Sequence, residues 1–381
     1  MEILMLTPDY YPDFFGGIGI YTYRIAEELA RFGNQITVLV ISGDHLIEGP
    51  VVVERVGDVE CWRFERKRKY RDNMNYSVYR LMSNSLHIID QLDVLLKNKT
   101  FDLIHCHDYF SAFVADYLRR TVKKPIITTI HTGKMEERMF GDSLRRNLIA
   151  NSSQIIFDSH YTKEYIDQTY CMDVQSEVIG CGVDIGEKRQ IDCKEKYISY
   201  CGRLRQHKGA KLLIEAFHLV SNNSVLKGVN LHIAGDGEML QELQELVNEY
   251  RLADRVVFLG KLSIADTRSQ MRNSLLHIVP SYEEAFGLTG IEAMAEHTCV
   301  LVSNAGGMTD YVRDGINGAI FQAGNITELC DKIIRLLENS QLRESYAAAG
   351  YDTAKAYSWY AIAQKMQTIY MTATKQVGDK L

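Results

Sequence analysis

Short, almost uninterrupted apolar runs alternate along the chain with amphipathic stretches of helical period. Such runs predict strands buried on both faces, and the stretches between them predict helices that cover a parallel sheet. In the first half the predicted strands are Ile3–Thr7, Gln35–Ile41, Leu103–Cys106, Ile126–Ile130 and Gln154–Phe157. In the second half they are Tyr197–Cys201, Leu231–Ala234, Val256–Leu259, Leu275–Val279 and Cys299–Ser303. The pattern therefore predicts an α/β fold.

The two series of strands are separated by a polar, glycine-bearing segment, 182–189, which we interpret as a linker. A chain of 381 residues exceeds the size at which one hydrophobic core keeps growing, so two domains are expected. We place an N-terminal Rossmann-like domain at 1–182 and a C-terminal one at 190–356. Two such domains facing one another leave a cleft at their strand ends, where α/β proteins bind ligands.

Composition narrows the classes of function. A net charge of −6 gives no broad basic field for nucleic acid, so a small-molecule or glycan substrate fits better. No apolar stretch approaches the length of a membrane span, and the apolar run at the start is too short for a signal peptide. The eight cysteines include no C-x-x-C pair, which is typical of reduced thiols in a cytoplasm. We therefore expect a cytoplasmic protein.

The most informative segment runs from Pro280 to Ala295 and holds Glu284 and Glu292, spaced as E-x7-E. It predicts a strand end, an acidic loop and a helix whose first turn contains Phe286, Gly287, Leu288 and Thr289. The N–H groups of such a turn suit a phosphate, and carboxylates beside it suit neutral hydroxyls. A nucleotide sugar offers both. The plain alternative is an amphipathic helix with two surface glutamates.

A second motif, Gly202-Arg203-Leu204-Arg205-Gln206-His207-Lys208-Gly209, follows the first strand of the second half. Arg203 and Lys208 there can offset the charge of a departing diphosphate, which is work that a metal does in other enzymes. No paired-aspartate motif for Mg²⁺ stands out, so we expect no metal and no cofactor. A solvated basic loop is the alternative.

Glycine turns follow other strands. The segment 13–19 contains Gly16 and Gly17 and lets backbone approach a diphosphate or a sugar, although a tight strand-to-helix turn explains it equally well. It is not a dinucleotide fingerprint, because Thr22 stands where a third glycine is needed, and a dehydrogenase is the weaker interpretation. Gly235 and Asp236 end another strand, where a nucleobase and ribose can lie or a plain turn can form.

Histidines end two strands of the first half. His131 follows one strand, and His107 with Asp108 follows another. A histidine at a strand end is more often structural than catalytic, and two on adjacent loops of one sheet bring the two interpretations close to even.

In their order along the chain (glycine loop, His131, G-R-x-x-x-x-K-G, glycine turn, E-x7-E), the motifs resemble those of retaining glycosyltransferases of family four, also called glycosyl transferases group one. The G-R-x-x-x-x-K-G match is complete, whereas Ala285 stands where Gly or Ser is more usual. The resemblance implies a GT-B fold, with a closing helix at about 357–372 that crosses back onto the first domain. It assigns His131 to the transferred sugar and the first domain to the acceptor, which we expect to meet His107 and Asp108.

We therefore predict a retaining transferase that moves a hexose or N-acetylhexosamine from a nucleotide sugar to an acceptor hydroxyl on a small molecule, glycan or lipid. Frequency in the family favours a UDP-linked donor. The catalytic residues are predicted to be His131, Arg203, Lys208 and Glu284. The donor-binding residues are predicted to be Gly16, Gly17, Gly235, Asp236, Phe286, Gly287, Leu288, Thr289 and Glu292, with Glu284 on the sugar and Glu292 on the ribose. The alternatives are an epimerase or hydrolase of the same fold and a non-catalytic nucleotide-sugar binding protein.

One strongly basic stretch stands out in the acidic chain. It interleaves aromatic residues with six cations, Arg63, Arg66, Lys67, Arg68, Lys69 and Arg71. We favour a solvated loop or helix face for it. The alternative is peripheral contact with anionic lipid head groups or a phosphorylated acceptor at the inner face of the membrane.

Overall fold

The computed structural model describes residues 1–13, 17–41, 45–69, 75–97, 99–133, 139–171, 174–186 and 195–378. The chain forms two compact units. Unit 1 comprises Met1–Gly182 together with Trp359–Leu381, and unit 2 comprises Val183–Ser358. The expected linker at 182–189 begins at the boundary between the units, and its last residues lie outside the described ones.

Unit 1 is built on a sheet of eight strands in the order β3-β4-β2-β1-β5-β6-β7-β8 among its described residues. All neighbours are parallel except β3 and β4. The strands are β1 (Glu2–Thr7), β2 (Gln35–Val40), β3 (His45–Val56), β4 (Val59–Lys69), β5 (Leu103–His107), β6 (Ile126–Ile130), β7 (Gln154–Phe157) and β8 (Ser176–Val178). The central strands are buried along almost their whole length, as their apolar runs predict.

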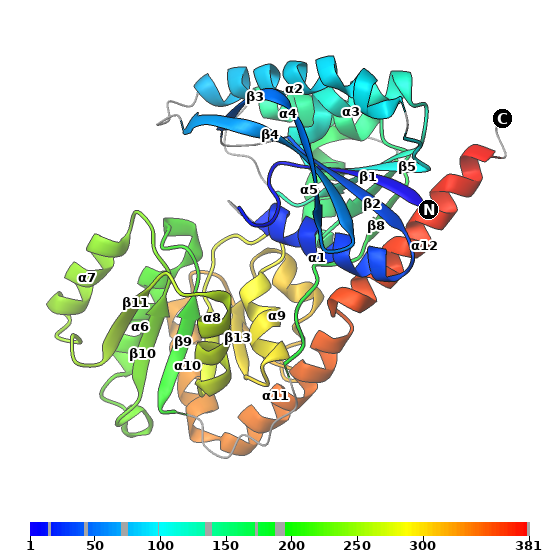
Figure 1. Ribbon diagram of the computed structural model, residues 1–381. Coiled ribbons are helices and arrows are strands. Elements are labelled where there is room, and N and C mark those ends of the chain that lie inside the picture. Colours follow the sequence, from blue (N-terminus) through cyan, green and yellow to red (C-terminus); the bar gives the residue numbers. More distant parts are fainter. Residues whose placement is uncertain are drawn as a thin grey trace. The chain divides into compact units, whose positions relative to one another are not determined.

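Helices cover both faces of this sheet (Figure 1). They are α1 (Gly17–Arg31), α2 (Asn75–Leu96), α3 (Ala112–Thr121), α4 (Met139–Ala150), α5 (His160–Tyr170) and α12 (Trp359–Gly378). Apolar residues of α2, α3 and α4 share one core with Leu4, Leu39 and Trp62. Helices α1 and α12 pack against each other on the other side.

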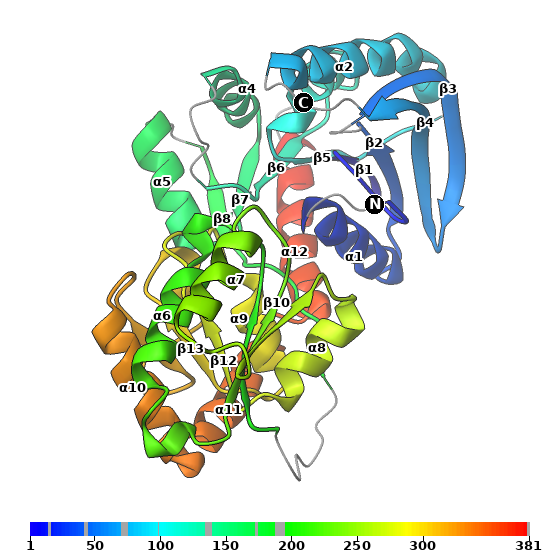
Figure 2. The ribbon, with the colours of Figure 1, turned by 90° about the vertical axis from the view of Figure 1, so that its left-hand side faces the viewer.

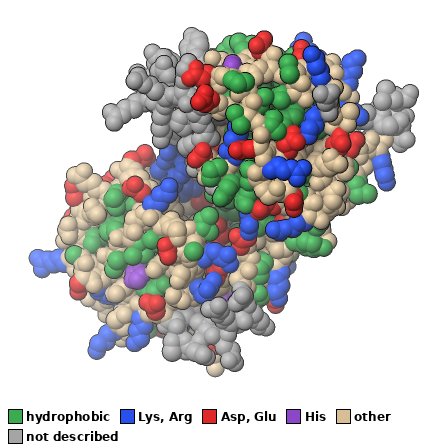
Figure 3. Space-filling view, viewed as in Figure 1, with side chains coloured by type: hydrophobic (Ala, Val, Ile, Leu, Met, Phe, Trp, Pro, Cys, Tyr) green, Lys and Arg blue, Asp and Glu red, His purple; other side chains and the backbone are tan. Residues whose placement is uncertain are grey.

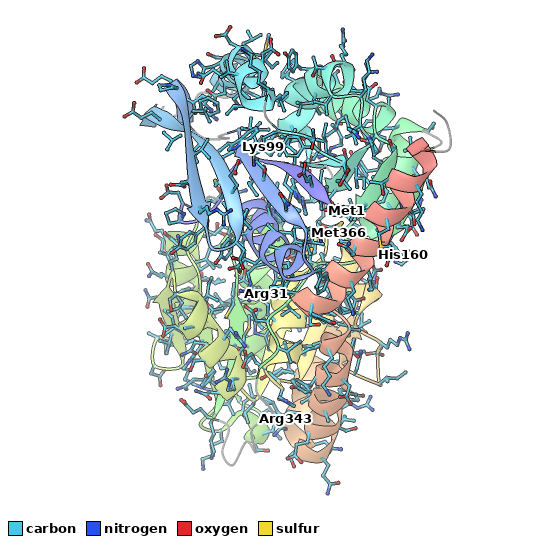
Figure 4. The ribbon with its side chains drawn as sticks, turned by 45° about the vertical axis from the view of Figure 1, so that its right-hand side comes forward. Met1, Arg31, Lys99, His160, Arg343 and Met366 are labelled. Carbon is cyan, nitrogen blue, oxygen red and sulfur yellow. The ribbon has the colours of Figure 1, made fainter. Side chains whose placement is uncertain are left out.

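The closing helix α12 is therefore an integral part of unit 1. Its Met366 and Tyr370 are fully buried. Asn34 joins this helix to the start of the chain, because its amide donates to Gln367 at 2.8 Å and its carbonyl oxygen accepts from the Met1 amine at 3.3 Å. Figure 4 labels Met1 and Met366 in this region.

The basic stretch forms a strand, so the expectation of a loop or helix face is wrong. Residues 63–69 belong to β4, which pairs antiparallel with β3 and parallel with β2. Trp62 and Phe64 are buried in the core, which fixes this strand against the sheet. Arg63 pairs with Glu54 of β3 and donates to the carbonyl of Tyr11. The remaining side chains of the stretch lie outside the described ones.

Unit 2 contains a wholly parallel sheet of six strands in the order β11-β10-β9-β12-β13-β14 within its described range. Figure 2 labels β10, β12 and β13 of this sheet among its helices. The strands are β9 (Tyr197–Cys201), β10 (Asn230–Ala234), β11 (Val256–Gly260), β12 (Leu276–Val279), β13 (Val300–Ser303) and β14 (Ala319–Phe321). The order reverses between β9 and β12, since later strands add on opposite sides of β9. Ligands of doubly wound sheets bind at such a point.

Six helices are described around this sheet. They are α6 (Ala210–Val220), α7 (Leu240–Glu249), α8 (Ile264–Asn273), α9 (Leu288–Ala295), α10 (Ile326–Glu338) and α11 (Ser340–Lys355). Buried residues of α6, α7 and α10, among them Phe217, Leu243 and Ile333, form one core with β9 and β10. This packing leaves the carboxyl ends of the strands to the loops that carry the predicted motifs.

Charges of both signs are interspersed on the face drawn in Figure 3, in keeping with the small net charge of −6. In the portion of the chain that can be described, no helix combines the length and apolar character needed to traverse a bilayer.

Candidate active site

The loops after β9 and β10 lie against each other at the carboxyl edge of the unit 2 sheet. Cys201 and Ala234 are paired at the ends of these strands. Gly235 follows with φ of 140°, and a Cβ at this position would lie 1.8 Å from the carbonyl oxygen of Gly202. Leu204 N then donates to the carbonyl of Asp236 at 2.9 Å. Only glycine permits this approach, which fixes the backbone on both sides of Arg203.

Arg203 projects from this loop as an exposed side chain, and no ion pair is seen for it with any residue the structure describes. Beside it is a cavity of about 530 Å³ at the ends of β9, β10 and β11, lined also by Arg205, Lys261, Asp236 and Thr289. A volume of this size is in the range of small-molecule sites. The cavity is rich in cations, which suits an anionic ligand.

Lys208 and Glu284 form an ion pair across the point where the strand order reverses. The Lys208 Nζ donates to Glu284 Oε1 at 2.8 Å, and the Ser281 hydroxyl donates to the same oxygen at 3.0 Å. The side chains are 24% and 14% exposed. An ion pair so close to solvent contributes little to stability, so a ligand can replace it at small cost. The sequence predicts both residues but not their contact.

The loop that carries Glu284 leads into α9 through a left-handed turn. Gly287 has φ of 82° at the N-cap, where no side chain caps the helix. The Tyr311 hydroxyl donates to the Gly287 carbonyl at 2.5 Å and holds the turn in place. Thr289 in the first turn lines the cavity, and Leu288 is exposed. The start of α9 therefore offers backbone N–H groups to an anion at the cavity.

Phe286 differs from its neighbours in this turn. Its ring is buried and packs on Tyr311 and Tyr357, with centroids 5.2 and 5.8 Å apart. Its side chain is therefore part of the core, and only its backbone remains for the predicted role in donor binding.

Glu292 lies one turn further along α9 and is partly buried. Burial raises the pKa of Glu292 to about 7, with Arg268 lowering it and the Glu296 carboxylate raising it. Glu296 itself is buried and is held by Arg268 and Arg272. Burial thus brings the pKa of this carboxyl group of α9 close to neutral pH.

In unit 1, the parallel register of β5 and β6 brings the two predicted histidines together. His107 is level with Thr129, two residues before His131. His107 Nδ1 and His131 Nε2 are 3.1 Å apart, and the rings stack with centroids 5.4 Å apart. His131 also contacts the edge of Tyr21, at 4.7 Å between centroids. Burial lowers the pKa of His131 to about 4 and holds that of His107 well below its ordinary value, so both are neutral at pH 7.

Asp108 is fully buried and is engaged by its own unit. Its Oδ2 accepts from the Thr132 hydroxyl at 2.7 Å and from the backbone N–H groups of Thr132 and His131. Arg145 of α4 completes the arrangement, since it pairs with Asp108 and donates to the Gly133 carbonyl at 3.0 Å. The burial of Asp108 argues against the predicted contact with an acceptor. Its carboxylate instead holds the backbone that carries His131.

The predicted glycine loop is only partly described. Gly16 lies outside the described residues, and Gly17 is the first residue of α1. A Cβ at Gly17 would meet no atom within 4 Å. Packing against the described residues therefore does not require glycine at this position, and the approach of a ligand to Gly17 stays a prediction.

Comparison with known proteins decides the family. Residues 15–187 match Glycosyltransferase Family 4, and residues 184–353 match Glycosyl transferases group 1. The chain belongs to the GT-B glycosyltransferases of family four. The resemblance given by the motifs is thereby confirmed, as are the fold class and the assignment to transferases.

Relatives of this family-four glycosyltransferase align over nearly its whole length. An uncharacterized glycosyltransferase of Methanocaldococcus jannaschii is 27% identical, over 99% of this chain and 100% of its own. Sucrose-phosphate synthase from Thermosynechococcus elongatus has a similar structure, with a TM-score of 0.80 at 20% identity, covering 97% of this chain and 98% of its own. Anabaena HepE, solved in complex with UDP, gives a TM-score of 0.74 at 19% identity over 98% and 100%.

Three further residues lie beside predicted ones within their own units and are not among the residues that the sequence predicts. Lys261 and Arg205 line the cavity beside Arg203, and Arg145 supports Asp108. Over the ranges that the structure describes, no group of three or more His, Cys, Asp and Glu side chains is placed to hold a metal ion.

Proposed function

We propose that this glycosyltransferase moves a hexose or N-acetylhexosamine from a UDP-linked donor to an acceptor hydroxyl, with retention of the anomeric configuration. The observation that carries the proposal is the combination of Arg203, Lys208 and the uncapped start of α9 at one edge of the unit 2 sheet. Cations and oriented N–H groups at one point are what a departing diphosphate requires.

Arg203 grips the diphosphate with two parallel N–H bonds, because its exposed guanidinium is free to turn toward the cavity. Lys208 adds a compact charge. In the structure that charge is shared with Glu284 at 2.8 Å. A bound phosphate competes for Lys208 and leaves Glu284 Oε1 to accept from a hydroxyl of the sugar.

Glu292 accepts from the ribose hydroxyls at the start of α9. With a pKa raised to about 7 by burial, it is ionised on the alkaline side of neutrality, where a carboxylate accepts two hydroxyl bonds. Gly235 and Asp236 contact the nucleoside from the cavity wall, where both residues lie.

No cofactor or metal takes part in the proposed reaction. As the bond between sugar and phosphate breaks, positive charge develops on the sugar and negative charge on the diphosphate, which Arg203 and Lys208 stabilise. A leaving phosphate oxygen on the same face takes the proton of the acceptor hydroxyl, which gives retention without a protein nucleophile. The contacts of Gly17 with the diphosphate and of His131 with the transferred sugar are the family's and stay predictions for this chain.

The choice of uridine is supported by HepE, a similar fold solved with UDP. The acceptor is a small molecule, a glycan or a lipid. Contact with an anionic membrane through the stretch Arg63 to Arg71 stays a prediction, and it draws on the cations beyond Arg63, which is already paired with Glu54.

A thermal-shift panel of nucleoside diphosphates and nucleotide sugars tests the donor. A ligand at one hundred times its dissociation constant adds about 2.7 kcal/mol of stability, so UDP and its true sugar donor should stand out. Proton NMR of the product made with an α-linked donor should show an α-linkage. Free sugar released without an acceptor would indicate a hydrolase, and a C2- or C4-inverted sugar an epimerase. Binding without turnover across an acceptor panel would indicate a binding protein.

A further inference from the structure

Three imidazoles gather at the carboxyl ends of β5 and β6 in unit 1, but they differ in their hydrogen bonds. His105 and His107 lie two residues apart on one strand, so they share a face of the sheet. Both ring nitrogens of His105 are engaged. Its Nε2 is 2.8 Å from Thr129 Oγ1, and its Nδ1 is 2.6 Å from the hydroxyl of Tyr370 on α12. His107 is bonded through Nδ1, toward His131, and its buried Nε2 has no hydrogen-bond partner among the residues that the structure describes.

The contact between His107 and His131 needs one N–H and one lone pair. Burial keeps the pKa of each imidazole below neutrality, so each ring carries a single proton at pH 7. Two arrangements satisfy this condition. Either His107 donates from Nδ1 to His131 Nε2, or His131 donates from Nε2 to His107 Nδ1.

The unpartnered nitrogen of His107 distinguishes the two arrangements. If His131 were the donor, the proton of His107 would be on Nε2, as a buried N–H without an acceptor. If His107 is the donor, its Nε2 carries only a lone pair. Buried N–H groups without a partner are rarer in proteins than acceptors with unused lone pairs, because an unmet donor loses a strong bond to water. The first arrangement is therefore favoured.

We propose that His107 is a positioning residue that donates from Nδ1 to His131 Nε2 and so holds His131 with its proton on Nδ1. His131, a partly exposed residue, then carries an N–H donor at Nδ1, which suits a hydroxyl oxygen of a sugar. The edge contact with Tyr21 and the bond from His131 N to Asp108 Oδ2 fix the ring and its backbone. The use of this donor rests on the proposed function, whereas the position of the proton does not.

Nitrogen-15 NMR of the whole protein with labelled histidine tests the proton position directly. Long-range correlations at pH 7.5 distinguish protonated from unprotonated ring nitrogens, and loss of signals in His131→Gln assigns them. We expect a protonated Nδ1 and an unprotonated Nε2 for His131 in the wild type. A protonated Nε2 would overturn the proposal, and this experiment requires no variant to be stable beyond the one used for assignment.

Substitutions of His107 test its role as donor. His107→Asp offers only an acceptor when ionised, so His131 should shift its proton to Nε2, whereas His107→Asn keeps an amide donor and should keep the proton on Nδ1. His105→Asn is the matched control, since it removes a neighbouring buried imidazole that makes no hydrogen bond to His131. If His131 keeps the same tautomer in His107→Asp and in the wild type, His107 does not set it.

Activity measurements distinguish a failure of this inference from a failure of the proposed function. We expect His107→Asp to lower kcat about 10- to 100-fold, because a lone pair would face the sugar where a donor is needed, and His107→Asn to stay within about threefold of wild type. A merely structural role would lower both alike. If NMR shows the expected tautomer but His131→Gln retains full transfer activity, the contact of His131 with the sugar is wrong while the positioning by His107 stands.

Discussion

The carboxyl edges of the two sheets differ in how their polar and charged side chains are held. In unit 1, the groups around His131 are neutral, buried and bonded to one another, with Asp108 and Arg145 fully enclosed behind them. In unit 2, Arg203 is exposed and Lys208 is held by one partly exposed ion pair. The first arrangement fixes donors and acceptors before a ligand arrives. In the proposed function, the second keeps charge available until a phosphate displaces a carboxylate.

The two edges therefore differ in how much folding free energy a substitution removes. Replacing a buried, bonded group loses folding energy because the partners left behind remain desolvated. Replacing an exposed cation loses little folding energy, since water already solvates it. Substitutions at the two edges should therefore have separable effects on stability and on activity.

Arg145→Met should lower the stability of unit 1 by about 3 to 5 kcal/mol, because it leaves the buried Asp108 carboxylate without its cation. Urea unfolding followed by tryptophan fluorescence measures unit 1 alone, since both tryptophans, Trp62 and Trp359, belong to it. Arg119→Met is the control, because Arg119 is exposed and pairs with Asp116 on the same helix. Equal losses for both variants would mean that Arg145 has no special structural role.

Arg203→Ala and Lys208→Ala should each slow turnover about 10²- to 10³-fold, the usual loss when a group aimed at developing charge is removed. Their melting temperatures should stay within a degree or two of wild type, in contrast to Arg145→Met. Lys211→Ala is the matched control on the next helix, where Lys211 pairs with exposed Glu242. A rise in KM without a fall in kcat would show that the cations bind ground state and transition state equally.

Unit 1 should lose stability as the pH falls below 6.5. Burial lowers the pKa of His105 to about 3 and of His131 to about 4, and holds that of His107 lower than usual, so the unfolded chain takes up protons first. Asp158 opposes this, because burial raises its pKa to about 7 and the folded state keeps that proton. The free energy of unfolding should therefore fall by on the order of 2 kcal/mol per pH unit between pH 6 and 5. Tryptophan-detected urea melts of wild type and His105→Asn measure it, and a variant slope as steep as wild type would refute the assignment to His105.

Substitutions of the two glutamates, Glu284 and Glu292, should affect different ligands. Glu284→Gln should impair sugar transfer more than it weakens the binding of free UDP, because Glu284 is assigned to the sugar. Glu292→Gln should lower the affinity for UDP several-fold at pH 8 and much less at pH 6. At pH 6 the raised pKa of Glu292 already leaves the wild-type group protonated. Calorimetry at both pH values compares them. Identical losses of UDP affinity in the two variants would remove the distinction.

Much of the fold was predictable because local pattern and tertiary structure agree. The strands at 126–130, 154–157 and 197–201 were predicted to the residue, since each is a short buried run between turns. The hairpin of β3 and β4 was missed. Charged residues alternate with Trp62 and Phe64 in the sequence of β4, and the cation run that follows hides these two apolar positions. Such a strand is recognised only when its partner is known.

The residues of the candidate site were predictable where a continuous motif carries each of them. Arg203, Lys208 and Glu284 come from two continuous segments, but their ion pair joins residues 76 apart in the chain. In unit 1, the spacing of His105 and His107 already indicates a shared face of one strand, a signal that could have added His105 to the cluster. The contact of His105 with Tyr370 spans 265 residues and has no local signal.

Calorimetric titration of UDP in excess EDTA tests most directly the claim that exposed side chains of unit 2, without a metal, bind the diphosphate. Wild type should bind UDP with unchanged affinity after chelation, and Arg203→Ala/Lys208→Ala should bind at least about 100-fold more weakly, as expected when two charge-assisted contacts are lost. The account would be contradicted if binding disappeared in EDTA and returned with Mg²⁺ or Mn²⁺, or if the double variant bound UDP as tightly as wild type.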